Sequence, residues 1–198
     1  MIKFDNLSKE RPYKIFKEKY DESSKAHQLN IEAICISSYS NELKEVNARF
    51  VNLKLINKKN FIFFSNYASP KAKEFNAHSQ IIALIYWNST NTQIRLKANI
   101  KKTSTNFNKT YFSQRDKNKN ALAISSNQSL PIESFEQVRK NYNKSIMEDN
   151  LEECPNHWGG FEFKPYYFEF WKGHESRLNE RDVYEMKNGK WENYILEP

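Results

Sequence analysis

The sequence predicts a mainly β protein, an antiparallel barrel to which helices have been added. Roughly seven or eight short runs are rich in β-branched and aromatic residues, and most follow one another in hairpin order. Two stretches with helical periodicity interrupt them. The chain has 198 residues, of which 38% are hydrophobic and 15% aromatic. This length suits one domain over residues 1–198, with a core built largely of Phe, Tyr and Trp.

The N-terminal part, residues 1–28, is expected to be a helical segment. Residues 10–28 are charged, and Ile15, Phe16 and Tyr20 recur at a spacing that places them on one face of a helix. This pattern is typical of a helix that lies on the surface of the protein.

Five strand-like runs follow, and a short helix lies among them. The helix is expected over residues 69–78, with Ser69 as N-cap and Pro70 at the first helical position. The polar sequence NSTN (88–91) reads as a turn. The strand-like runs are IEAICISS (31–38), NARFVNLKLI (47–56), NFIFFSN (60–66), SQIIALIYW (79–87) and TQIRLKANIKK (92–102).

Residues 106–148 lose the strand pattern and read as a helical insertion, in which Pro131 is expected to begin the second helix. Strands return over residues 157–198. Asn188 and Gly189 form a dipeptide that strongly predicts a type I′ hairpin turn. The three C-terminal runs are GGFEFKPYYFEFW (159–171), RDVYEMK (181–187) and KWENYIL (190–196).

The net charge of +7 admits either a nucleic-acid partner or a small anionic ligand. The lysines are scattered and form no long run of like charge, which disfavours nucleic-acid binding. No stretch has the length and apolarity of a signal peptide or membrane span. The two cysteines, Cys35 and Cys154, do not make a disulfide framework. A cytoplasmic protein without a membrane or nucleic-acid partner is therefore expected.

The scarcity of glycine restricts how this chain can hold a phosphate. Only four glycines occur, all after residue 158, so neither a Rossmann fingerprint nor a P-loop can be built. Arginine and lysine side chains must take that role. The four histidines show no metal-binding spacing, and no metal site is expected.

An ordered series of short motifs resembles the pyridoxamine 5′-phosphate oxidase family, from about residue 30 to the end of the chain. Each motif alone is weak, but the order and spacing of the set are specific. The stretch HWGGFEFKPYYFEFWKG (157–173) is similar to the strand pair of that family's C-terminal part. The other motifs are RFVNLK (49–54), FFSNYASPKA (63–72), YFSQR (111–115), SSNQS (125–129), RLNER (177–181) and the final Leu196-Glu197-Pro198.

The resemblance implies an antiparallel split β-barrel that binds FMN at the interface of a homodimer. It also implies that side chains hold the FMN phosphate, as the lack of glycine-rich loops requires. The positions that match the family's cofactor contacts are Arg49, Phe50, Val51, Asn52, Leu53, Lys54, Phe64, Ser65, Lys71, Gln93, Gln128, Trp171 and Arg181.

The resemblance further implies a small phosphorylated pyridine as substrate, with dioxygen as electron acceptor. Hydride would pass from the amine- or alcohol-bearing carbon to the flavin, and oxidation of pyridoxamine (or pyridoxine) 5′-phosphate would give pyridoxal 5′-phosphate. Arg177 and Asn179 match the catalytic positions. The matching substrate-binding positions are Lys54, Tyr111, Arg115, Lys119, Arg177 and Asn179.

Several positions depart from the family pattern. Asn179 stands where the family has a histidine, so no imidazole titrates there. Lys119 replaces a serine of the substrate-phosphate site, and Pro70 replaces an arginine that assists the FMN phosphate. For an N-terminal segment that closes over the substrate, only Arg11 and Tyr13 are candidates.

Two other functions therefore stay open. Asn179 and Lys119 favour a related FMN oxidase that acts on another aromatic substrate, as in phenazine biosynthesis. An FMN-binding module without this activity is the other. Taken singly, residues such as Arg177 and Arg181 also have a plain structural explanation, because they flank Glu180 and could form surface ion pairs.

Overall fold

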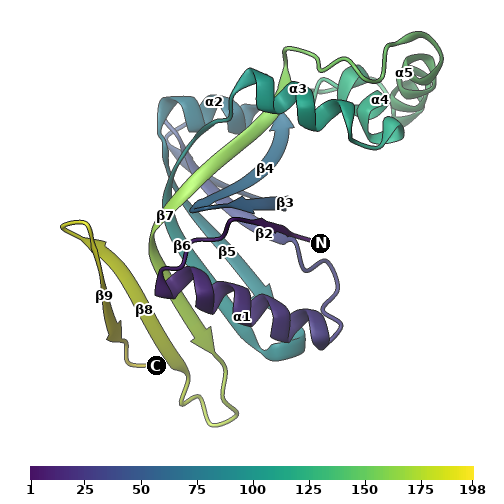
Figure 1. Cartoon of the computed structure of the whole chain (residues 1–198). Helices are drawn as coiled ribbons and strands as arrows, with labels where there is room; N and C mark the ends of the chain where they lie inside the picture. The colour runs from purple at the N-terminus through teal and green to yellow at the C-terminus, as the bar shows by residue number, and fades with distance from the viewer.

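The computed structural model describes residues 1–198 and contains a closed antiparallel barrel (Figure 1). Around the barrel, each strand pairs with the next in the order β3, β2, β5, β6, β7 and β4, and β4 pairs back to β3. The mainly β fold with helical additions is thereby confirmed. These strands are β2 (Ala33–Ser40), β3 (Glu45–Asn57), β4 (Asn60–Asn66), β5 (Gln80–Trp87), β6 (Thr92–Lys102) and β7 (Trp158–Lys172).

Strand β7 connects the barrel to the C-terminal hairpin, because it pairs with strands of both. On one side it pairs with β6 along nearly its whole length. On its other side it pairs first with β4 and then with β8 (Glu180–Lys187). Its 15 residues, at about 3.3 Å each, extend about 50 Å along the strand. The two ends of β7 therefore belong to different regions of the protein.

The barrel core is aromatic, as the composition indicates. Phe61 stacks on Phe163 with ring centroids 5.3 Å apart, and Phe63 stacks on Phe161 at 5.7 Å. Helix α1 (Arg11–Lys25) packs on this core, so the segment expected to be a surface helix has a fully buried face. Among its buried residues is Tyr13, which has no exposed surface and cannot act from there as a substrate lid.

Residues 105–148 form three helices that project together from one end of the barrel (Figure 1). They are α3 (Thr105–Ser113), α4 (Lys117–Ser125) and α5 (Phe135–Glu148), and each has a side-chain N-cap. The expectation that Pro131 begins the last of these helices is wrong. The Ser134 hydroxyl accepts a hydrogen bond of 3.1 Å from the Gln137 amide and so fixes the helix start at Phe135.

Short local signals place the remaining elements. Helix α2 (Pro70–Ala77) begins at its proline, as expected. The NSTN turn is a 3₁₀ turn (Asn88–Thr90). Strand β8 and strand β9 (Lys190–Ile195) form the C-terminal hairpin, in which Asn188 and Gly189 have φ of 50° and 79°, as a type I′ turn requires. The sequence did not reveal β1 (Lys3–Asp5), which pairs in parallel with β3.

Candidate functional site

A buried lysine without a carboxylate partner lies at the start of helix α2. Lys71 has only 8% of its surface exposed and forms no ion pair. Glu74 and Glu169, the other two buried charged residues, both pair with arginines. The Lys71 ammonium instead donates to neutral oxygens. These are Ser65 Oγ at 3.3 Å, Ser69 Oγ at 3.3 Å and Gln128 Oε1 at 3.1 Å, and together with Lys71 they form what we call the Lys71 site.

The local sequence explains why Lys71 is buried. Pro70 begins the helix, so Lys71 lies in the first turn, where helix dipoles favour an anion rather than a cation. Burial lowers the pKa of Lys71, and so does the positive charge of Arg49, whereas Glu74 acts in the opposite direction. A desolvated cation among hydroxyl groups, at a helix N-terminus, suits a phosphate group.

Arg49 lies at the same end of the barrel as the Lys71 site, but its charge is paired with a carboxylate. It reaches from β3 to Glu74 on α2, with Nη2 2.9 Å from Oε2, and also donates to the Ser38 hydroxyl. Its neighbours along β3 divide between two faces, because strand side chains alternate. Phe50 and Asn52 point outward and are exposed, whereas Arg49 and Val51 are half-buried and Leu53 lies in the core.

Lys54 completes this run but lies at an irregularity in the β3–β4 pairing, between Leu53 and Leu55. Such bulges redirect side chains. The Lys54 ammonium lies 3.4 Å from a Glu32 carboxylate oxygen, so its charge is paired.

Next to the Lys71 site is a cavity of about 210 Å³ where the barrel meets α4. Phe64 stacks on Tyr111 with centroids 3.8 Å apart, and the Arg115 guanidinium lies 5.3 Å from the centroid of the Trp158 ring. Arg115 Nη1 donates to the backbone carbonyl of Lys119 at 2.8 Å. The lining includes Phe64, Ser65, Arg115, Lys119, Gln128 and Trp158, so cofactor and substrate positions from separate motifs meet here.

Burial raises the pKa of the Tyr111 hydroxyl and lowers that of Arg115. In Tyr111 the Arg115 charge opposes the shift, and Tyr111 likewise opposes the shift of Arg115. The Tyr111 hydroxyl therefore stays a neutral donor near neutral pH, because its pKa moves further above that range. Both can hold a phosphate.

A second group of expected residues lies at the other end of β7. In the antiparallel register Gln93 pairs with Trp171, and Trp171 pairs with Arg181. These three residues, which we call the Arg181 row, come from β6, β7 and β8 and project from the same face of the sheet. The register therefore brings together three positions that the sequence separates.

The loop that joins β7 and β8 carries Arg177 and Asn179. Arg177 has φ of 60°, an uncommon left-handed conformation for this residue type. Asn179 Oδ1 accepts a hydrogen bond of 3.1 Å from the backbone amide of His174. The Asn179 side chain thus closes its own loop, while Arg177 is exposed and forms no ion pair.

One chain does not bring the two groups of residues together. Ser65 of the Lys71 site pairs with Gly159 at the start of β7, whereas Arg181 pairs with Trp171 near its end. About 40 Å of strand separates these two positions. The expected site residues therefore form two separate groups on one chain, which we call the half-sites. The outer face of the barrel bears exposed apolar side chains at Val46, Phe50, Ile82 and Tyr86.

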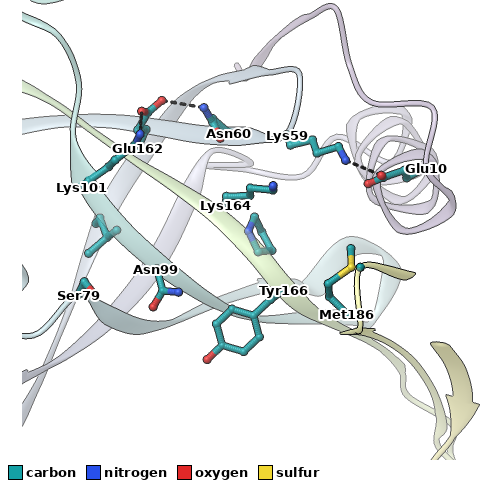
Figure 2. A pocket seen from close by; sticks show the side chains of 13 residues that line it. Glu10, Lys59, Asn60, Ser79, Asn99, Lys101, Glu162, Lys164, Tyr166 and Met186 are labelled. Atoms are coloured by element: carbon teal, nitrogen blue, oxygen red, sulfur yellow. Dashed lines mark hydrogen bonds and ion pairs between the residues drawn. The ribbon is translucent and has the colours of Figure 1, made fainter. Parts of the chain in front are cut away.

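A larger cavity, of about 730 Å³, lies elsewhere (Figure 2). None of the residues expected to bind cofactor or substrate line it. Two of its lysines are neutralised within the cavity, Lys59 by Glu10 at 2.5 Å and Lys101 by Glu162 at 3.3 Å. Of its three lysines, only Lys164 lacks an ion pair.

No group of three or more His, Cys, Asp or Glu side chains could hold a metal ion. None of the helices combines the length and apolarity that crossing a membrane requires.

Sequence reasoning missed three contributors to these sites: Ser69 as a Lys71 partner, Trp158 beneath Arg115, and Glu169 beside Arg181. The sequence predicts only an N-cap role for Ser69, and in the structure its hydroxyl makes no capping bond. Glu169 gave a signal, because a carboxylate inside the apolar run YYFEFW must be paired if it is buried.

Comparison with known proteins agrees with this fold. A family model for the pyridoxine 5′-phosphate oxidase C-terminal dimerisation region matches residues 158–198. A pyridoxine/pyridoxamine 5′-phosphate oxidase from Coxiella burnetii is 32% identical over 200 residues and covers 100% of both chains. The enzyme of that name from Leptospira interrogans is 30% identical over 190 residues, which are 94% of this chain and 88% of its own.

Two solved structures share the fold. PhzG from Burkholderia lata, in complex with tetrahydrophenazine-1-carboxylic acid, superposes with a TM-score of 0.89 at 21% identity, over 95% of this chain and 93% of its own. A pyridoxamine 5′-phosphate oxidase-related, FMN binding protein from Nostoc punctiforme gives 0.78 at 9% identity, over 96% and 99%.

The closed barrel and the strand β7 that joins its two ends define a split β-barrel protein. By sequence, the chain belongs to the pyridoxine/pyridoxamine 5′-phosphate oxidase family. The family resemblance of the ordered motifs is thereby confirmed.

Proposed function

We propose that the protein is an FMN-dependent oxidase that converts pyridoxamine (or pyridoxine) 5′-phosphate to pyridoxal 5′-phosphate. The observation that carries this proposal is the Lys71 site, in a chain that belongs to this family. Its donor set fits the phosphate of FMN, because a buried ammonium without a carboxylate partner can donate to phosphate oxygens. The Ser65 and Ser69 hydroxyls, which now donate to Gln128 Oε1 and the Asn66 carbonyl, would turn to donate to the phosphate. Arg49 would supply a second cation at this end.

Bound FMN would supply the hydride acceptor, and dioxygen would reoxidise it with release of hydrogen peroxide. The protein's own task is to bind and orient the substrate and to exclude water. Arg115 and Lys119 line the cavity and would hold the substrate phosphate, with the Tyr111 hydroxyl as a neutral donor. Arg115 is already oriented by the Lys119 carbonyl and the Trp158 ring. The Arg181 row would wall the cofactor, and Arg177 would contact the substrate.

We also propose that the active form is a homodimer, because a single chain holds the two half-sites at opposite ends of β7. A second copy could bring the Arg181 row and Arg177 of one chain to the Lys71 site of the other. The exposed apolar outer face supports this proposal, as does the match of residues 158–198 to a dimerisation region.

A second candidate is a related oxidase that acts on another aromatic substrate. The state of Asn179 favours it: no imidazole is present at this position, and the amide oxygen is used by the loop backbone. An enzyme that binds FMN but oxidises pyridoxamine 5′-phosphate very slowly would fit this candidate.

Anaerobic reduction tests the proposal. The purified protein, loaded with FMN, is mixed with pyridoxamine 5′-phosphate without oxygen while the flavin band at about 450 nm is recorded. Bleaching that air reverses, with formation of hydrogen peroxide, is the expected result. A protein that binds FMN but keeps its band would contradict this substrate and favour the second candidate. A protein that binds no FMN would contradict the proposed function altogether.

A further inference from the structure

A buried carboxylate lies beside the Arg181 row. Glu169 is only 2% exposed and lies on β7, two residues before Trp171 and on the same face. Its register partners are Arg95 on β6 and Val183 on β8. No cofactor or substrate position of the family resemblance coincides with Glu169, although it lies directly under residues expected to bind the flavin.

Charged and polar donors surround Glu169. One carboxylate oxygen accepts hydrogen bonds from Arg181, with Nε at 3.0 Å and Nη2 at 2.8 Å. The other accepts from Arg95 Nε at 2.9 Å and Tyr167 OH at 3.0 Å, and from Arg95 Nη2. We call Arg95, Tyr167, Glu169 and Arg181 the Glu169 cluster. Burial would raise the pKa of Glu169, but the hydrogen bonds from Arg181, Arg95 and Tyr167 hold it below its ordinary value.

The bonds to Glu169 fix the direction of the Arg181 guanidinium. A guanidinium has five N–H donors in a rigid plane. Glu169 takes two of them, and the backbone carbonyl of Glu197 takes a third from Nη1 at 2.9 Å. Two N–H groups are left for a ligand. Their direction is fixed, because Glu169 holds the guanidinium plane at Nε and Nη2 and the Glu197 carbonyl holds it at Nη1. Arg95 balances the carboxylate, so the Glu169 cluster keeps one net positive charge.

We propose that Glu169 is a positioning residue that aims Arg181 at the flavin. Glu169 is too buried to touch a ligand, and its two oxygens are occupied by protein donors. Its effect on cofactor binding must therefore pass through Arg181. This inference rests on the proposed function, because only there is Arg181 a cofactor ligand.

A double-mutant cycle on FMN affinity tests the inference. The dissociation constant of FMN is measured by flavin fluorescence for wild type, Glu169→Gln, Arg181→Ala and the double variant. Glu169→Gln is expected to raise the constant about tenfold in wild type, as loss of a charged hydrogen bond does. In the Arg181→Ala background the same change should have almost no effect.

Glu162→Gln is the matched control, because Glu162 is also a paired carboxylate on β7 and contacts Lys101 and Asn60 rather than Arg181. Its FMN constant should equal that of wild type. Additive effects in the cycle, or an unchanged constant for Glu169→Gln, would overturn the inference. If Glu169→Gln gives no cooperative thermal unfolding, Glu169→Asp keeps the charge but shortens the reach, and its effect should also vanish without Arg181.

The outcomes separate this inference from the proposed function. If wild type binds no FMN, both fail. If wild type binds FMN and Arg181→Ala weakens binding while Glu169→Gln does not, the proposed function stands and the role of Glu169 is refuted.

Discussion

At the scale of single residues, Lys71 combines two properties that usually oppose each other. It is buried, which disfavours its charge, and it lacks a carboxylate that would compensate. Hydroxyl and amide oxygens accept its three hydrogen bonds but leave its positive charge without a countercharge. Lys71 is therefore expected to lower the free energy of unfolding of the cofactor-free protein. Binding of an anion should supply the missing countercharge and remove this destabilisation.

Replacing Lys71 with methionine should separate stability from binding. We expect Lys71→Met to raise the free energy of unfolding of the cofactor-free protein by about 1 kcal/mol, because an uncompensated buried charge is lost. FMN binding should weaken by at least about tenfold. Thermal unfolding and fluorescence titration measure the two effects. Lys73→Met, on the exposed side of the same helix, is the control and should change neither.

The pH dependence follows from the lowered pKa of Lys71, which burial causes together with Arg49. The unfolded chain holds this proton up to about pH 10.5, whereas the folded chain releases it at lower pH. Between those values the unfolded state binds more protons, so stability rises with pH. The stability deficit of wild type against Lys71→Met should shrink as pH rises toward 10.5. A constant or growing deficit would show that the lysine is not desolvated.

Asn179 can be tested by two substitutions with opposite expectations. If its oxygen serves to close the loop on the His174 amide, Asn179→Asp retains this acceptor and should keep kcat/KM within about threefold of wild type. Asn179→Ala removes the acceptor and should lower kcat/KM about tenfold, mainly through KM, because Arg177 loses its fixed position. Steady-state kinetics decides. Equal losses for both variants would instead indicate that the amide donates directly to substrate.

At the scale of elements, the junction of β7 with helix α3 shows how closely the barrel and the helical end are joined. Asn108 on α3 donates to the Tyr67 hydroxyl at 2.9 Å and accepts from the Gly160 amide at 2.9 Å. Tyr67 in turn donates to the Gly160 carbonyl at 2.8 Å. A Cβ atom on Gly159 would lie only 2.3 Å from the Tyr67 hydroxyl oxygen. Glycine is required there by close approach.

Gly159→Ala should therefore destabilise the protein by about 1–3 kcal/mol, the usual cost of overfilling a packed site. The FMN constant should also rise, since the Lys71 site adjoins this junction through Ser65. Gly189→Asn is the matched control: its site is open, and Asn tolerates the positive φ of the hairpin turn. Chemical denaturation compares the two. A neutral Gly159→Ala would mean that Tyr67 and Asn108 move apart without cost.

The elements also show what the sequence could predict and what it could not. The strands and the Asn188–Gly189 turn could be predicted correctly, because each is determined by residues that are close together in the sequence. The start of α5 was misplaced because Pro131 and Ser134 are competing signals, and the capping bond decided. The pairings of Lys71 with Gln128 and of Arg181 with Glu169 depend on contacts that only the tertiary structure makes. Periodicity carries no information about such contacts.

At the scale of the whole molecule, a single chain leaves apolar side chains exposed on the outer face of the barrel. Ile82 and Tyr86 on β5 are partly exposed, and Phe50 on β3 is 73% exposed. Apolar side chains gathered in this way mark a surface for another protein, and the proposed homodimer would cover it.

Ile82→Asp should disrupt the proposed dimer, because a charge would be buried without a partner in its interface. Analytical ultracentrifugation should show a monomer, and FMN binding should weaken about tenfold or more since the half-sites no longer meet. Met147→Asp, at the exposed end of α5, is the control and should stay dimeric. A wild-type protein that is monomeric while binding FMN tightly would contradict the proposed assembly.

Strand β7 also has a consequence for biosynthesis. Strands β4 and β6 both pair with β7, so the ring of strands cannot close until residues 158–172 have been made. During translation the growing chain would therefore expose unpaired strand edges and a wide aromatic surface for most of its length. Closing the ring joins residues separated by about a hundred positions, such as Asn60 and Glu162, and pairings of such long range are slow. This chain should thus depend on chaperones more than its modest size suggests.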